Sequence, residues 1–191
     1  MQSIYAMTQS HNDDIVKEEK FLKYSIKKMF DLYVLLLQIL VEVQKHAEQK
    51  LEISKKKHLA TKEDLSPNTK FVNNRLIKKI AESSSIALHL EAQKLDNWSL
   101  DDEYVKIIWD ELSKSTLYKK YLNTIEDSYK VDKSFVIDFY KEIVAPNEKL
   151  AEYFEDTNIT WGRWHSLCQY LGSAYLEQAK YQRSLHAWFF V

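Results

Sequence analysis

Residues 21–47 read FLKYSIKKMFDLYVLLLQILVEVQKHA, and this stretch determines the fold class. Apolar side chains recur in it at alternating steps of four and three residues, which is the spacing of one helix face; they are Leu22, Ile26, Met29, Tyr33, Leu36, Leu40, Val43 and Ala47. A second apolar stripe runs beside the first, formed by Phe30, Val34, Leu37 and Val41. Because two stripes need neighbours on two sides, we expect a long central helix over about residues 15–57.

The same stretch is too polar to cross a membrane. Its most apolar part, residues 30–43, contains Asp31, Gln38 and Glu42 and is shorter than the roughly 20 residues that a bilayer requires. The chain does not begin with the basic and apolar regions of a signal peptide. Its single cysteine, Cys168, excludes an internal disulfide framework and a cysteine-based zinc site. We therefore expect a cytoplasmic protein with no membrane association.

Shorter helical patterns follow the central one, at about residues 71–80, 86–95, 101–112, 117–122, 135–143 and 150–154. Pro67 and Pro146 and the run of serines 83–85 separate them, and Ser99 is expected to cap the helix that contains the acidic residues 101–103. No stretch alternates with a period of two for long enough to predict a strand. The fold class is therefore all-α, a bundle of about six or seven helices around one long central helix.

The last thirty residues differ in composition from the rest. Residues 1–161 contain no glycine, whereas Gly162, Gly172 and Cys168 all fall in residues 162–191. Glu177 is the only acidic residue after Trp161. We therefore divide the chain into a helical region, residues 1–161, and a tail, residues 162–191, that we do not expect to belong to the native fold.

Candidate catalytic and metal-binding groups are few. Glu42 and His46 lie one helical turn apart and could face one ion, and the carboxylates of residues 101–103 could attract Mg²⁺. A solvated helix surface and helix capping explain the same residues. Cys168 near His165 lacks a third orienting group, and no phosphate-binding glycine loop or hydrolase motif occurs. We expect no enzymatic activity, no cofactor and no metal; a metal-dependent hydrolase built on these carboxylates is the remaining catalytic alternative.

The distribution of charged residues gives only weak support for nucleic-acid binding. Lys and Arg number 27 against 28 Asp and Glu, a net charge of −1, so no strong overall field attracts a polyanion. The densest local group of cations comprises Lys70, Arg75, Lys78 and Lys79, set among asparagines. Such a surface can contact phosphates. The alternative is a charged, solvated face, since no aromatic residue beside it is clearly exposed for stacking on bases.

Several segments resemble the transcription antitermination factor NusB, in the enlarged form found in Bacteroidota. Residues 2–13, QSIYAMTQSHND, are similar to the end of that family's first helix. Residues 24–33 (YSIKKMFDLY), 58–59 with 64–75 (HL and DLSPNTKFVNNR), and 152–156 with 159–161 (EYFED and ITW) are similar to its helical N-terminal region. The resemblance covers nearly all of residues 1–161, and residues 67–75 are its most specific part.

The resemblance implies a non-catalytic RNA- and protein-binding component of antitermination complexes. The partners that it implies are boxA-type RNA and the small-subunit ribosomal protein that acts as NusE. In the family's RNA-facing first helix only Gln2 and Tyr5 have matching positions here. Tyr5 could stack or hydrogen-bond at the RNA, or it could pack between helices.

Two departures from the family lead us to expect a weakened function. NusB proteins begin with arginines that approach the RNA, whereas this chain begins at a position after them, which suggests a late start. The family continues past the position of Trp161 with helices that hold NusE, whereas residues 162–191 are unrelated, which suggests a frameshift near codon 162. The alternative is a free-standing helical scaffold or protein-interaction module anchored by residues 30–43.

Overall fold

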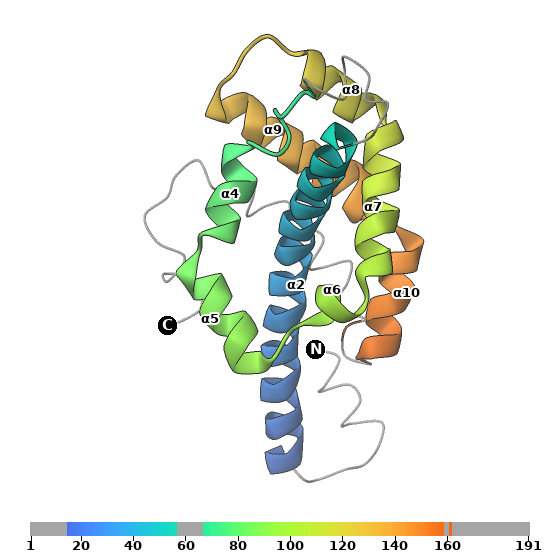
Figure 1. Ribbon diagram of the computed structural model, residues 1–191. Helices are drawn as coiled ribbons and strands as arrows, with labels where there is room; N and C mark the ends of the chain where they lie inside the picture. The colour runs from blue at the N-terminus through green and yellow to red at the C-terminus, as the bar shows by residue number, and fades with distance from the viewer. Residues whose placement is uncertain (1–14, 57–66, 159–160, 162–191) are drawn as a thin grey trace.

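The computed structural model describes residues 15–56, 67–158 and 161, and throughout these ranges the regular structure is helical. The predicted all-α fold class is confirmed, with one long helix as expected. The described helices, in chain order (Figure 1), are α2 (Ile15–Lys55), α4 (Arg75–Ala81), α5 (Ser84–Gln93), α6 (Asn97–Leu100), α7 (Asp102–Lys114), α8 (Thr116–Asn123), α9 (Tyr129–Phe139), the π-helix η1 (Tyr140–Val144) and α10 (Glu148–Thr157). Gln2, Tyr5 and the tail, residues 162–191, lie outside the described residues.

Helix α2 is the axis of the bundle. In Figure 1, α4 and α5 lie along one side of it, α7 and α10 along the other, and α8 and α9 cross at the end where α2 finishes. The apolar side chains of its second half are almost fully buried; they are Leu32, Val34, Leu35, Leu36, Leu37, Ile39, Leu40, Val41, Val43 and Ala47. Burial on several faces is what the two predicted apolar stripes require.

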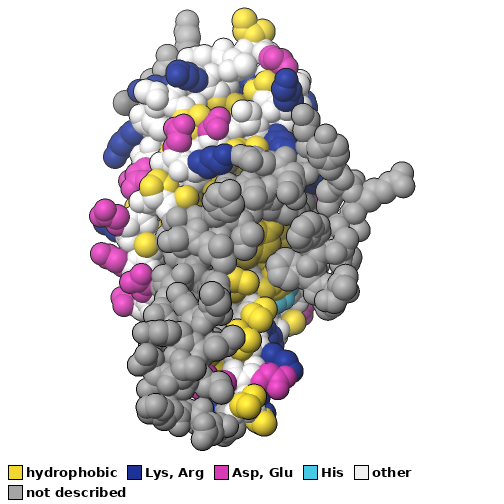
Figure 2. All heavy atoms as spheres, turned by 180° about the vertical axis from the view of Figure 1, so that it is seen from behind, with side chains coloured by type: hydrophobic (Ala, Val, Ile, Leu, Met, Phe, Trp, Pro, Cys, Tyr) yellow, Lys and Arg dark blue, Asp and Glu magenta, His cyan; other side chains and the backbone are white. Residues whose placement is uncertain are grey.

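The first turns of α2 are not part of this core. Leu22 and Ile26, which belong to the first predicted stripe, are 42% and 48% exposed, so the helix is central only in its second half. Ile15, Val16 and Phe21 are exposed as well. This half of α2 extends beyond the other helices, and hydrophobic side chains gather at the same end of the molecule in Figure 2.

Two predicted helix starts are wrong. Phe71 lies in a turn before α4, although its side chain is fully buried, and α4 starts only at Arg75. Ser99 does not cap α7, because it lies inside the one-turn helix α6. That turn places Trp98 in the core, where its indole N–H donates to the Leu35 carbonyl at 3.0 Å.

The remaining boundaries follow the expected breaks. Helix α5 starts within the serine run at Ser84, and η1 ends just before Ala145 and Pro146. Each helix expected from residue 15 onward has a counterpart, while α6 and the π-helical geometry of η1 were not expected. Within the described parts of the chain, no helix is both long enough and apolar enough to cross a membrane.

Candidate nucleic-acid interface

Asn74 fixes the turn that carries the predicted basic cluster. This side chain is fully buried, and its Oδ1 accepts the backbone N–H groups of Leu76 and Ile77 at 3.0 and 3.2 Å. It is therefore the N-cap of α4 and satisfies two donors that a helix start leaves free. The cap ends the turn at residue 74 and starts the helix that carries Lys78 and Lys79.

The amide of Asn74 also joins this turn to α8 and α9. Its Nδ2 donates to the Tyr121 hydroxyl at 3.1 Å and to the Asp132 carbonyl at 3.2 Å. The Tyr121 hydroxyl donates to the Asp132 carboxylate at 2.7 Å. Burial first, and then the hydrogen bond to Asp132, raise the pKa of Tyr121 far above its usual range, so this hydroxyl stays protonated and keeps donating.

Two of the predicted RNA-contacting cations hold the loop between α8 and α9. The Lys70 ammonium donates to the carbonyls of Thr124 and Glu126 and lies 5.0 Å from the centre of the Tyr121 ring. The Arg75 guanidinium donates to the Asp127 carboxylate at 2.8 Å. Lys70 and Arg75 therefore fasten a loop more than fifty residues away in sequence, while parts of both side chains remain at the surface.

The other two predicted cations lie apart from this loop. The Lys78 ammonium donates to the Asn73 side chain at 2.9 Å, in the turn that precedes α4. The Lys79 ammonium lies 5.6 Å from the centre of the Tyr129 ring on α9, a cation–π geometry. All four cations thus have partners inside the protein. Only Lys70 and Arg75 contact the same element, the loop between α8 and α9.

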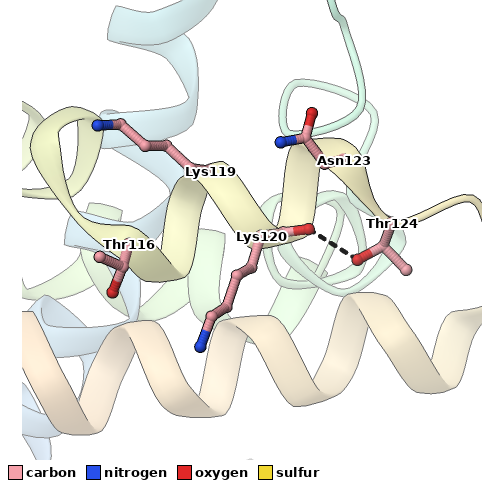
Figure 3. A pocket seen from close by; sticks show the side chains of 5 residues that line it. All are labelled: Thr116, Lys119, Lys120, Asn123 and Thr124. Carbon is pink, nitrogen blue, oxygen red and sulfur yellow. Dashed lines mark hydrogen bonds between the residues drawn. The ribbon is translucent and has the colours of Figure 1, made fainter.

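A shallow, open pocket on α8 contains cations that the sequence did not single out. Its volume is about 480 Å³, and five side chains line it (Figure 3): Thr116, Lys119, Lys120, Asn123 and Thr124. The Thr124 hydroxyl donates to the Lys120 carbonyl at 2.8 Å, which closes the last turn of α8. The available signal was the adjacent lysines 119 and 120 on a short amphipathic helix, a pattern that usually indicates only a solvated face.

The predicted metal ligands have other partners. The Glu42 carboxylate accepts hydrogen bonds from Gln38 and Lys45 at 2.7 and 2.8 Å. The His46 ring lies edge-on to Trp109, and burial, followed by the charge of Lys50, lowers the pKa of His46.

The acidic side chains at residues 101–103 do not converge on one site, because Asp101 and Asp102 contact different partners. Asp101 accepts the Tyr153 hydroxyl at 2.8 Å, and Asp102 pairs with Lys106 one turn along α7 at 2.7 Å. Asp102 and Glu103 lie in the first turn of α7 as predicted, but the N-cap of that helix is Asp101, whose side chain makes no capping hydrogen bond. The described residues contain no group of three or more His, Cys, Asp or Glu side chains that could hold a metal ion.

A buried carboxylate on α2 forms a second polar cluster. Asp31 is fully buried, and its two oxygens contact the Lys28 ammonium and the His89 imidazole, each at 2.8 Å. His89 belongs to α5 and packs edge-on against Phe30 at 4.6 Å between ring centres. The cluster joins α5, in which Ile86 is the one buried side chain, to the axis of the bundle.

Trp161 ties the end of the described chain to the same part of α2. It is 3% exposed, and its indole N–H donates to the Lys28 carbonyl at 2.7 Å. Its ring also meets Phe154 of α10 edge-on at 5.8 Å. Trp161 and Lys28, which are 133 positions apart in the sequence, are thus in direct contact.

No protein-family model, no curated protein and no solved structure matches the chain.

Proposed function

We propose that the chain is a NusB-like, cytoplasmic and non-catalytic component of antitermination complexes that binds RNA and protein. The partners in this proposal are boxA-type RNA and the ribosomal protein that acts as NusE, both bound weakly. The observation that carries it is the meeting, on helix α2, of the three internal segments with the resemblance to NusB.

Residues 24–33 are part of α2 itself. The most specific segment, residues 67–75, is bound to α2 through Gln44, whose Nε2 donates to the Val72 carbonyl at 2.9 Å, and through the fully buried Phe71. The third segment returns to α2 through Trp161 and the Lys28 carbonyl. If these three segments derive from one helical family, we expect them to contact one another in the core. Their positions on and around α2 therefore support the proposal.

Weak RNA binding follows from the charges. A net charge of −1 supplies no general attraction to a polyanion, and Lys70, Arg75, Lys78 and Lys79 already have partners within the protein. Affinity for boxA-type RNA in the nanomolar range for this chain alone would contradict this part of the proposal.

The test adds the element that NusB-like proteins place before Gln2. An arginine-rich NusB-type start, fused directly before Gln2, is expected to raise the affinity for boxA-type RNA by at least about tenfold, as each new phosphate contact adds to binding. The gain should be smaller for a scrambled RNA of the same composition, because a correctly placed start acts together with the rest of a specific surface. Fluorescence anisotropy titrations with the NusE-type ribosomal protein present would measure both.

The matched control carries the same arginine-rich residues after Val191. It adds the same charge at a place where the resemblance predicts no RNA surface. Equal gains for both RNAs, or equal gains from either end of the chain, would contradict membership of the NusB family. They would instead favour the second candidate, a helical protein-interaction module, for which the exposed apolar residues at the start of α2, including Phe21 at 53%, provide a surface.

A further inference from the structure

The cations best placed for RNA in the described structure lie on α8. Lys119 and Lys120 are exposed, and neither ammonium has an ion pair or hydrogen bond to the rest of the protein among the described residues. Lys70 and Arg75, by contrast, are held by Thr124, Glu126 and Asp127. A cation without an internal partner gives up no interaction inside the protein when it binds a phosphate.

The pocket offers further groups that can bind phosphate. Thr116 lies one turn before Lys120 on the same face of α8, and Asn123 lies one turn after Lys119. Hydroxyl and amide side chains are common partners of phosphate oxygens beside lysine. In Figure 3 the two lysines project to different sides of α8, so that together they can contact phosphates along a stretch of strand.

Negative charge near the pocket is partly neutralised. Glu126 and Asp127 lie on the loop that continues from Thr124. The Asp127 carboxylate is paired with Arg75 at 2.8 Å, whereas the Glu126 carboxylate accepts the neutral Ser128 hydroxyl at 2.8 Å and keeps its charge. The Lys70 ammonium adds positive charge at the carbonyls of Thr124 and Glu126. Lys70 and Arg75 thus act as positioning residues for the edge of the pocket.

We propose that the α8 pocket lined by Thr116, Lys119, Lys120, Asn123 and Thr124 contacts the phosphates of single-stranded RNA, with Lys119 and Lys120 as the main ligands. The proposal builds on the RNA-binding part of the proposed function and assigns that part to α8. No aromatic side chain lines the pocket, so it lacks a platform on which bases could stack. It is therefore a surface for phosphates and does not distinguish RNA sequences.

The test reverses the two charges. The double variant Lys119→Glu/Lys120→Glu is expected to bind both boxA-type RNA and a scrambled RNA at least about tenfold more weakly at low salt, since it replaces two attractive charges at the phosphates with two repulsive ones. The slope of log affinity against log salt should become shallower by roughly 1.4, because each lysine that neutralises a phosphate of a single strand adds about 0.7 to that slope. Anisotropy titrations at several salt concentrations measure both quantities.

The matched control is Lys27→Glu/Lys149→Glu, which makes the same change in net charge at exposed lysines on α2 and α10, away from α8. This variant should bind RNA less than about threefold more weakly than the unmodified chain, as expected for long-range charge alone. Circular dichroism melts of both variants check that folding is intact.

An equal decrease in affinity in the two double variants, or no RNA binding by the unmodified chain at low salt, would overturn the α8 proposal. A failure of the proposed function would give a different result. A chain that binds boxA-type and scrambled RNA equally well would contradict the NusB-like function, but it could still bind both RNAs through α8.

Discussion

Replacing Asn74 with alanine is expected to lower the free energy of unfolding by about 3 kcal/mol. This value is the combined cost of losing a helix cap and losing two buried hydrogen bonds. Asn74 accepts from the backbone N–H groups of Leu76 and Ile77, and it donates to Tyr121 and to the Asp132 carbonyl. Alanine would leave the backbone N–H groups of Leu76 and Ile77 without their acceptor, whereas the Tyr121 hydroxyl would keep its bond to the Asp132 carboxylate. Urea denaturation followed by circular dichroism measures the change.

The neighbouring asparagine provides the control. Asn73 is exposed, and its side chain accepts one hydrogen bond, from Lys78. The change Asn73→Ala is therefore expected to cost no more than about 0.5 kcal/mol, which is typical of surface positions. Similar decreases in stability from the two substitutions would show that the contacts of Asn74 with α8 and α9 do not stabilise the fold as we describe.

Replacing Phe71 with alanine is expected to have a comparable or larger effect, about 3–5 kcal/mol, because a fully buried ring is removed from the core. Its ring lies between 5.6 and 6.5 Å, centre to centre, from four other aromatic rings, those of Trp109, Tyr118, Phe135 and Phe139. The cavity would therefore open where α2, α7, α8 and α9 meet. Chemical denaturation gives the stability, and near-ultraviolet circular dichroism reports the change in aromatic packing.

The same substitution at Phe21 is the control, since that ring is 53% exposed at the start of α2. Phe21→Ala should cost less than about 1 kcal/mol, because little apolar area returns to water. If Phe71→Ala cost no more than Phe21→Ala, then Phe71 would not occupy the centre of the bundle.

The long helix was predictable because its signal is local. Its apolar period runs through one continuous stretch, and the observed bounds, Ile15–Lys55, lie close to the expected residues 15–57. The position of Phe71 was not predictable in the same way, since its apolar side chain fits a helical pattern equally well. The side chain of Asn74 decides the boundary, because it caps α4 and keeps the preceding residues in a turn.

The candidate site shows a similar limit. Lys70 and Arg75 were chosen for the density of positive charge around them, but their roles depend on Thr124 and Asp127, which are far away in sequence and close only in the fold. Nothing in the local pattern indicates these partners. Lys119 and Lys120 lie between tyrosines and leucines on a short amphipathic helix, so in the sequence they resemble an ordinary solvated face.

The cations of residues 70–79 have partners inside the protein, whereas those of α8 are the ones that we propose for RNA. Lysine-modification footprinting of the unmodified chain, read by mass spectrometry with and without saturating single-stranded RNA at low salt, tests this division of roles. We predict that RNA lowers the reactivity of Lys119 and Lys120 and leaves that of Lys70, Lys78 and Lys79 unchanged. Protection of Lys78 and Lys79 by RNA, with Lys119 and Lys120 unchanged, would contradict it.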